Sequence, residues 1–240
     1  MKTLLLSKVR SRQHRGAFTL VEMLTVVGII AMLVALVTPA LVDVIRSTRL
    51  NAAGDGLVNR LSLAQQSAVS LGQEVEIRFY QYINDDSDRP GVPLFYAYQV
   101  VEMPVVNGVV QPRALSDVYY IESGIVLSGQ QGLSPLLQTT VQQQELPNQQ
   151  FLFRPTAQDV DPRAVQFAAL RFYPDGSCKS LSGDDPGTDV EASAKAYTIP
   201  ALIGSFVTFV ESREADSDQP KNFYCIQIDS YTGKTRVYRP

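Results

Sequence analysis

A run of 20 residues without a charged side chain, residues 23–42, constrains this chain more than any other feature. As an α-helix, a run of that length measures about 30 Å, the thickness of the hydrocarbon core of a bilayer. We therefore expect a helix over residues 18–42 that can cross a membrane. One carboxylate, Glu22, lies just inside the apolar block, where a charged side chain is costly and usually functional.

Residues 1–17 form a basic leader without an acidic residue. Its charged side chains are Lys2, Lys8, Arg10, Arg12 and Arg15. The positive-inside rule places such a terminus in the cytoplasm and the rest of the chain in the periplasm or outside the cell. An ordinary secretory signal is the alternative, since Thr38-Pro39-Ala40 offers the small residues of its cleavage site. That leader would be about 40 residues long with an acid at its apolar start, which is atypical.

The decapeptide Arg-Gly-Ala-Phe-Thr-Leu-Val-Glu-Met-Leu at residues 15–24 resembles the class III signal of type IV prepilins and type II secretion pseudopilins. The resemblance implies that a prepilin peptidase cuts between Ala17 and Phe18, that Phe18 becomes the N-methylated terminus, and that Glu22 guides subunit assembly. One departure is that the family usually has Gly before the cut, whereas here Gly16 is followed by Ala17.

Charge pairing gives Glu22 a physical role beside that resemblance. Cleavage would create an α-amino group at Phe18, which is mostly protonated at neutral pH. The Glu22 carboxylate of one subunit could pair with this amine on a neighbour, and a low-dielectric site strengthens that attraction. The partners would then be other pilin-like subunits, the peptidase and the inner membrane. The alternative is a plain anchor whose Glu22 only reaches the membrane interface.

From Asp43 the apolar pattern becomes that of an amphipathic helix, which we expect over residues 43–72. Apolar residues recur at steps of three and four: Leu50, Ala53, Leu57, Leu61, Ala64, Ala68 and Leu71. The expected wet face holds Arg46, Arg49, Asn51, Asp55, Asn59, Arg60 and Gln66. Gly72 is a stop signal, Pro39 should kink the helix, and Gly54 and Gly56 should weaken it locally.

Residues 73–240 are expected to form a β-rich head. Alternation of Val75, Ile77 and Phe79 with polar neighbours Glu76, Arg78 and Tyr80 predicts a half-buried strand. Further strands are expected near 94–102, 105–110, 118–127, 151–154, 165–173, 223–229 and 235–238. Residues 128–150 suggest a long surface loop and 182–191 an acidic loop, while 201–210 are apolar but too short to span a membrane.

Turn signals separate these strands. Asn107-Gly108 suggests a hairpin turn, Pro174-Asp175-Gly176-Ser177 a turn preset by its Pro and Gly, and Thr232-Gly233-Lys234 the final hairpin. The segments 170–176 and 228–234 resemble the head of H-type minor pseudopilins, the GspH/FimT-like group. The long insert and late Thr-Gly turn are also similar to the Verru_Chthon cassette protein D group. The resemblance implies an α+β, pilin-like fold: a long N-terminal helix packed on an antiparallel β-rich head.

Composition argues against enzymes and general nucleic-acid binders. The formal net charge is −3, and without the five basic residues of the leader it would be −8. The only histidine, His14, lies in the leader, so a mature Ser-His or Cys-His pair is excluded. A structural subunit without a cofactor is expected. The alternative is a FimT-like DNA-binding minor pilin using Lys234, Arg236 and Arg239, whose basic side chains could contact phosphates.

Two smaller questions concern the head. Asp184 and Asp185, with Asp189 and Glu191, could bind Ca²⁺, but their spacing is not that of an EF-hand loop, and a solvated loop without metal is expected. Cys178 and Cys225 would lie in an oxidising compartment. They could form a disulfide or be two small buried apolar residues.

Overall fold

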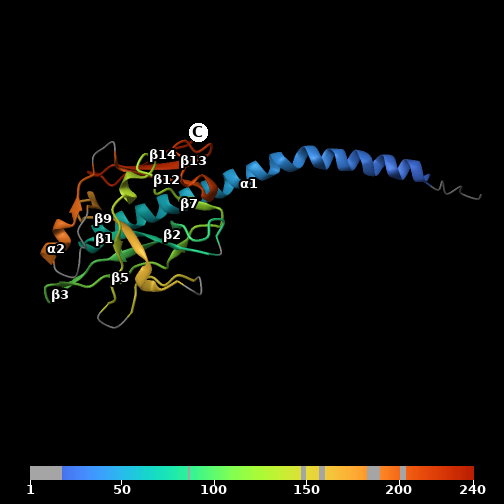
Figure 1. The fold of residues 1–240 in the computed structure, drawn as a ribbon. Helices are drawn as coiled ribbons and strands as arrows, with labels where there is room; N and C mark the ends of the chain where they lie inside the picture. Colours follow the sequence, from blue (N-terminus) through green and yellow to red (C-terminus); the bar gives the residue numbers. More distant parts are fainter. Residues whose placement is uncertain (1–17, 86, 147–149, 157–159, 183–189, 201–203) are drawn as a thin grey trace, which may run out of the picture. The chain divides into compact units, whose positions relative to one another are not determined.

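A computed structural model describes residues 18–240 except 86, 147–149, 157–159, 183–189 and 201–203, and the side chains of all described residues except 37–43 (Figure 1). The predicted leader, residues 1–17, lies outside the described residues. The chain divides into two compact units, Met1–Ile45 and Arg46–Pro240. Helix α1 (Leu20–Leu71) contributes residues to both.

In the first unit, α1 begins directly after Thr19, which acts as its N-cap. The helix assignment continues through Pro39, so the predicted kink there remains a prediction. Within the described part of the chain, no helix is long and apolar enough to cross a membrane. The membrane-spanning half of the expected helix is therefore not confirmed.

In the second unit, α1 buries the predicted apolar face. Its buried residues are Leu50, Ala53, Leu57, Leu61, Ala64 and Ala68. Leu71, assigned to the same face, is 50% exposed because the helix ends there. Gly72 follows with φ of 65°, the left-handed conformation that commonly terminates helices. The helix end is thus as predicted, and only its last apolar residue was misplaced.

Gly54 is a position of close packing between α1 and the sheet. A Cβ atom there would lie 2.4 Å from the ring of Tyr224. The missing side chain therefore lets the strand that carries Tyr224 approach the helix backbone closely. The close packing gives Gly54 a role that the sequence did not indicate, and local weakening of the helix there remains a prediction.

The head is an antiparallel sheet whose main order is β11-β10-β9-β1-β2-β7-β12-β13-β14, with β5 and β6 on β2 and β8 on β9. The strands are β1 (Val75–Ile83), β2 (Pro93–Glu102), β3 (Val105–Val106), β4 (Val109–Val110), β5 (Arg113–Ala114), β6 (Tyr119–Tyr120), β7 (Ile125–Leu127), β8 (Val141–Gln142), β9 (Gln166–Phe172), β10 (Cys178–Leu181), β11 (Tyr197–Thr198), β12 (Phe206–Glu211), β13 (Phe223–Ile228) and β14 (Thr235–Tyr238). Short helices are η1 (Pro135–Leu137), η2 (Pro162–Ala164), α2 (Val190–Lys195) and η4 (Ser212–Glu214). The α+β fold with a helix packed on an antiparallel sheet is therefore confirmed.

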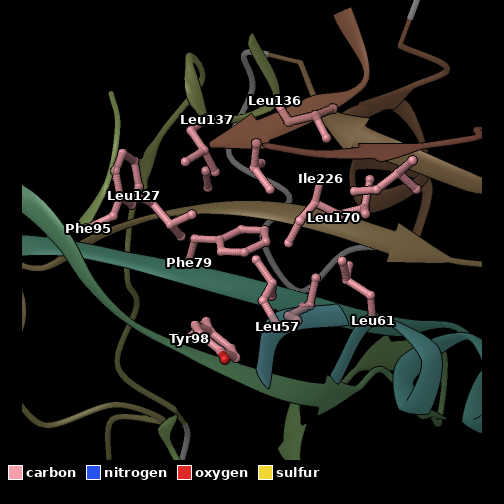
Figure 2. Close-up of a cluster of buried hydrophobic side chains, with 14 of the residues drawn as sticks. Leu57, Leu61, Phe79, Phe95, Tyr98, Leu127, Leu136, Leu137, Leu170 and Ile226 are labelled. Atoms are coloured by element: carbon pink, nitrogen blue, oxygen red, sulfur yellow. The ribbon is translucent and has the colours of Figure 1, made fainter. Parts of the chain in front are cut away.

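One face of the sheet packs on the second half of α1. Figure 2 shows Leu57 and Leu61 of the helix against Phe79 of β1, Leu170 of β9 and Ile226 of β13. The sheet curls around the helix, because strands far apart in its order meet again: the backbone N–H of Cys178 donates to the carbonyl of Ser230 at 2.8 Å. Gln65 of α1 donates to the carbonyls of Gly176 and Thr232, in the two turns that meet there.

The opposite face of β1 is also covered, so the expectation of a half-buried strand was wrong. Tyr80 stacks on Phe153 with ring centroids 4.1 Å apart. Both residues belong to a second cluster that includes Val141, Val165 and Phe167. The expectation of a surface loop at residues 128–150 was also wrong. Leu136 and Leu137 of η1 are buried in the helix-facing core.

Several local predictions are confirmed and two need correction. Asn107 and Gly108 both have positive φ, 54° and 77°, between β3 and β4, as a two-residue hairpin requires. In the turn after β9, Gly176 has φ of 85° and its N–H donates to Tyr173. The predicted strand at 118–127 is divided into β6 and β7, and residues 151–154 form no strand.

Candidate functional site

The first candidate site is the start of α1. The backbone N–H and the hydroxyl of Thr19 donate to Oε2 of Glu22 at 2.8 and 2.9 Å. The backbone N–H of Glu22 donates back to the Thr19 hydroxyl at 3.2 Å. This reciprocal pair is a capping box, and it holds the carboxylate at the positive end of the helix. Glu22 therefore has a defined orientation. Ala17, on the other side of the predicted cut, lies outside the described residues.

Apolar side chains surround Glu22, and the described ones are exposed. The large ones are Phe18, Leu20, Val21, Met23, Leu24, Val26, Val27, Ile29, Ile30, Met32, Leu33, Val34 and Leu36. Exposure reaches 75% at Phe18 and 79% at Leu20. A contiguous apolar surface of this kind marks a region that another molecule or a membrane covers.

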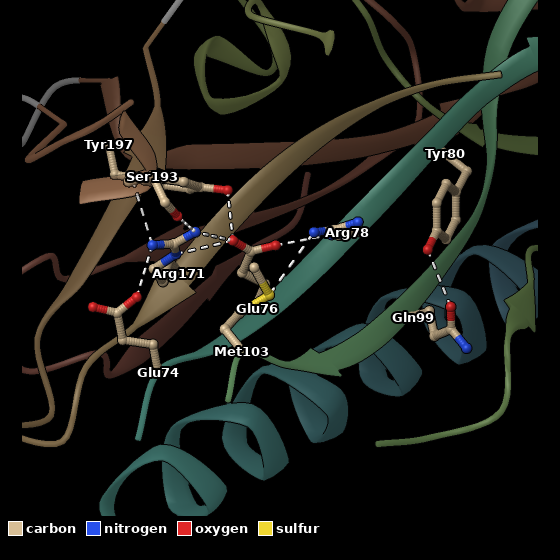
Figure 3. Close-up of polar contacts among 9 residues, drawn as sticks. All are labelled: Glu74, Glu76, Arg78, Tyr80, Gln99, Met103, Arg171, Ser193 and Tyr197. Carbon is tan, nitrogen blue, oxygen red and sulfur yellow. Dashed lines mark hydrogen bonds and ion pairs between the residues drawn. The ribbon is translucent and has the colours of Figure 1, made fainter. Parts of the chain in front are cut away.

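A second cluster, which sequence reasoning missed, lies inside the head. Glu76 of β1 is 0% exposed and faces two arginines (Figure 3). Its Oε1 accepts from Nη2 and Nε of Arg171, on β9, at 2.6 and 2.9 Å. Its Oε2 accepts from Nε of Arg78 at 2.8 Å. The Tyr197 hydroxyl also donates to Oε1, at 2.7 Å. We call these four residues and the partners of Arg171 the Glu76 network.

The remaining partners complete the charge balance. Nη1 of Arg171 pairs with Oε2 of Glu74 at 2.7 Å, and its Nη2 donates to the hydroxyl of Ser193 at 2.9 Å. The guanidinium of Arg171 also lies over the ring of Tyr197, 3.9 Å from the centroid. Two carboxylates thus face two guanidinium groups, and each buried charge has an opposite charge beside it.

Electrostatics keep Glu76 ionised. Burial alone would raise the pKa of this carboxyl, but the charges of Arg78 and Arg171 and the Tyr197 hydroxyl together lower it to about 2. The same burial raises the pKa of Tyr197 well above its usual range. Because Glu76 and Arg171 are at most 1% exposed, a substrate cannot reach them. The network is suited to fixing strand positions rather than to catalysis.

Both cysteines are free in the structure, so the disulfide that the sequence left open as one of two alternatives is not formed there. Side chains alternate between the two faces of a strand. On β13, Tyr224, Ile226 and Ile228 point to the helix-facing core, so Cys225 points to the other face. Cys178 belongs to the helix-facing core, where burial raises the pKa of its thiol to about 12. The two thiols therefore lie on opposite faces of the sheet.

The C-terminal basic residues are not one surface cluster. Nη2 of Arg239 pairs with Oδ1 of Asp55 on α1 at 3.1 Å, and its guanidinium lies 4.5 Å from the ring centroid of Tyr224. Lys234 and Arg236 are exposed. Arg239 thus binds the C-terminus to the helix, and Lys234 and Arg236 remain exposed for the DNA contact that was considered as the alternative.

The acidic loop is only partly described. Asp184, Asp185 and Asp189 lie outside the described residues. Glu191, in α2, pairs with Lys195 at 2.7 Å on the surface. Among the residues that the structure describes, no group of three or more His, Cys, Asp or Glu side chains could hold a metal ion.

Comparisons with known proteins place these sites in context. No protein-family description and no curated protein matches the chain. Among solved structures, the chain is similar to the minor pseudopilin EpsH from the type 2 secretion system of Vibrio cholerae, with 11% identity and a TM-score of 0.38 over 80% of this chain and 98% of that one. A crystal structure of the same minor pseudopilin aligns with 10% identity and a TM-score of 0.39, over 81% and 96% of the two chains. At these values the likeness assigns neither activity nor partners to this chain.

Proposed function

We propose that the protein is a pilin-like structural subunit, a minor pseudopilin that assembles through its N-terminal helix into a type II secretion pseudopilus or a type IV pilus-like fibre. One observation carries the proposal: the segment that begins with Phe-Thr-Leu-Val-Glu and continues into α1 exposes its large apolar side chains from Phe18 to Leu36. Such a surface needs an apolar environment from outside the subunit.

In this proposal the environment is first the inner membrane and then the packed helices of a fibre. Residues 18–42 cross the bilayer, residues 1–17 stay in the cytoplasm until the peptidase removes them, and the head faces the periplasm or the exterior. The basic leader supports this orientation. An apolar helix is stable in both places, so the subunit could move from membrane to fibre without exposing it to water.

Glu22 would set the register between neighbouring helices. The hydrogen bonds described for its carboxylate use Oε2, and both come from Thr19. Oε1 is then available to accept from the Phe18 ammonium of an adjacent subunit. A charge pair in an apolar fibre core attracts strongly, and a subunit out of register would leave both charges unpaired.

The peptidase cut is the step to test first. Co-expression with a prepilin peptidase should shorten the chain by residues 1–17, and mass spectrometry should find a new terminus at Phe18 carrying one methyl group. A peptidase with an inactivated catalytic site is the control. Ala17→Gly restores the residue usual in the family and should be cut at least as fast. A terminus at Leu41 instead would show processing by ordinary signal peptidase and would contradict the proposal.

A further inference from the structure

An open cleft of about 220 Å³ lies in the head where α1 passes the ends of β7 and β12. Its cationic lining comes from Arg46 and Arg49 on α1 and Arg213 on η4, and its anionic lining from Asp88 and Glu211. We call it the arginine cleft. Residues from four separate parts of the sequence meet there, which is why no local motif indicated it.

The two carboxylates of the cleft already have partners. Glu211 lies 3.9 Å from Nη1 of Arg46. Asp88 accepts from the hydroxyl of Ser212 at 3.2 Å, and the N–H of Ser212 donates to the carbonyl of Gly124 at 2.8 Å. These bonds hold the floor of the cleft in place.

The other two guanidinium groups face open space. Within the described residues, no carboxylate pairs with Arg49 or Arg213, and both side chains are exposed. A guanidinium presents several N–H donors in a planar fork that matches phosphate oxygens. The cleft therefore offers two unpaired forks around a fixed floor, and its ligand should be an anion with several oxygens.

The position in the sequence indicates the source of that anion. Arg46 and Arg49 come four and seven residues after Val42, the last residue of the apolar run. At 1.5 Å per residue of helix, this is about 6 to 10 Å, the depth of a headgroup layer beside the hydrocarbon. The positive-inside rule disfavours arginine near the non-cytoplasmic end of a membrane helix, so two of them there call for a specific role.

We propose that the arginine cleft binds the phosphate of an anionic phospholipid headgroup, such as phosphatidylglycerol, in the leaflet next to the head. This proposal rests on the proposed membrane insertion of residues 18–42. Bound lipid would hold the head against the bilayer before the subunit enters a fibre, and extraction from the membrane would then require release of that headgroup.

The test uses the full chain in nanodiscs of phosphatidylcholine with increasing phosphatidylglycerol, and native mass spectrometry to count retained lipids. The double variant Arg49→Gln with Arg213→Gln should lose its preference for phosphatidylglycerol, by about fivefold for each arginine removed. Arg154→Gln with Lys221→Gln removes the same charge from exposed positions outside the cleft and should keep the wild-type preference. If both variants lose the preference for phosphatidylglycerol equally, the preference comes from general surface charge, and the proposed lipid site in the arginine cleft is wrong.

Two further measurements show whether a negative result contradicts membrane insertion or only the lipid site. Resistance to alkaline extraction from membranes reports insertion alone, so a chain that is extracted contradicts the proposed function, whereas an inserted chain without lipid preference contradicts only the lipid site. Titration with inorganic phosphate is the second. If free phosphate binds with comparable affinity and the same dependence on Arg49 and Arg213, the cleft is a site for soluble phosphate and the lipid proposal is wrong.

Discussion

Glu22 and Glu76 are both carboxylates among apolar neighbours, and the chain treats them in opposite ways. Glu76 receives two guanidinium groups and a tyrosine hydroxyl from its own chain and is completely buried. Among the described residues, the carboxylate of Glu22 receives only the capping bonds of Thr19, on an exposed helix. The buried charge of Glu76 is therefore balanced within the head, whereas the described residues of the first unit supply no opposite charge for Glu22.

The difference teaches how to separate folding from assembly in this protein. Loss of a Glu76 partner should lower the free energy of unfolding of the head, because an uncompensated charge stays buried. Loss of Glu22 should leave the head intact and weaken contacts between subunits. Substitutions around Glu76 should therefore change the unfolding of the head, and substitutions at Glu22 should change assembly. A substitution that changes both would contradict this separation.

The largest effect is expected for Arg171→Met. The substitution leaves Glu76 with Arg78 as its only cation in the network, and removing one partner of a buried ion pair typically costs about 3–5 kcal/mol. Urea unfolding of the full chain in mild detergent measures the loss. Because the chain has no Trp, tyrosine circular dichroism should report the transition.

Lys195→Met provides the matched control for Arg171. Its ion pair with Glu191 is exposed on both sides, and exposed pairs contribute about 0.5 kcal/mol. If the two variants unfold at the same urea concentration, the buried network does not stabilise the head, and the contrast between the two carboxylates fails.

Glu22→Gln should reduce assembly by the next largest amount. The neutral side chain leaves the Phe18 ammonium of a neighbour without a counter-charge in the fibre core, a loss of a few kcal/mol for each contact. Cleavage at Phe18 and urea unfolding of the head should not change. Sheared-fibre fractions and crosslinking to other pilin-like subunits measure the effect.

Thr19→Ala separates the two roles of the N-terminal site. It removes the two bonds of the Thr19 hydroxyl, one donated to Oε2 of Glu22 and one accepted from the Glu22 backbone N–H, but keeps the bond from the Thr19 backbone N–H and the carboxylate. Loss of a cap costs about 1 kcal/mol of helix stability. If assembly depends on the charge, Thr19→Ala should form more fibre than Glu22→Gln. Equal defects would assign the effect to the capping box instead of to pairing between subunits.

Acid should destabilise the head through protonation of Glu76. The pKa of Glu76 in the folded head is about 2, below the usual 4.5. A lowered folded pKa contributes stability above the unfolded pKa, and that stability is lost as the pH falls from about 4.5 toward 2. The shift corresponds to roughly 3 kcal/mol. Urea midpoints between pH 7 and pH 2 should fall more steeply for the wild type than for Glu76→Gln, and parallel curves would contradict the assignment.

Features set by neighbouring residues could be predicted from the sequence. The apolar face of α1 follows from steps of three and four, and the turns at Asn107-Gly108 and at Gly176 follow from residues that tolerate positive φ. The candidate site at Phe18 and Glu22 was found because its residues form one short motif. The capping bonds between Thr19 and Glu22 join residues three apart.

Features set by distant residues could not be predicted. Alternation in β1 placed Glu76 and Arg78 toward water, but the other face of the sheet is covered by residues from distant parts of the chain, among them Val141, Phe153 and Tyr197. Arg171 and Tyr197 lie 95 and 121 residues from Glu76 in the sequence. A charged residue within the apolar strand around Arg171 was the available signal, since such a charge needs an opposite partner in the core.

Within the Glu76 network, the smallest predicted change is Tyr197→Phe, which removes one hydrogen bond from Glu76 and leaves the ring over Arg171. Because Oε1 keeps its two bonds from Arg171, the free energy of unfolding should fall by about 1.5 kcal/mol, the low end for a bond to a charged group. The acid-induced loss of stability should also be smaller and should end at a higher pH, since this hydroxyl helps to lower the pKa of Glu76 in the folded head. Tyr98→Phe is the control. The hydroxyl of Tyr98 is buried without a hydrogen-bond partner among the described residues, so its removal should leave the head unchanged or slightly more stable. If Tyr98→Phe destabilises the head as much as Tyr197→Phe does, the effect of Tyr197 comes from packing, and the hydroxyl does not belong to the charge balance of Glu76.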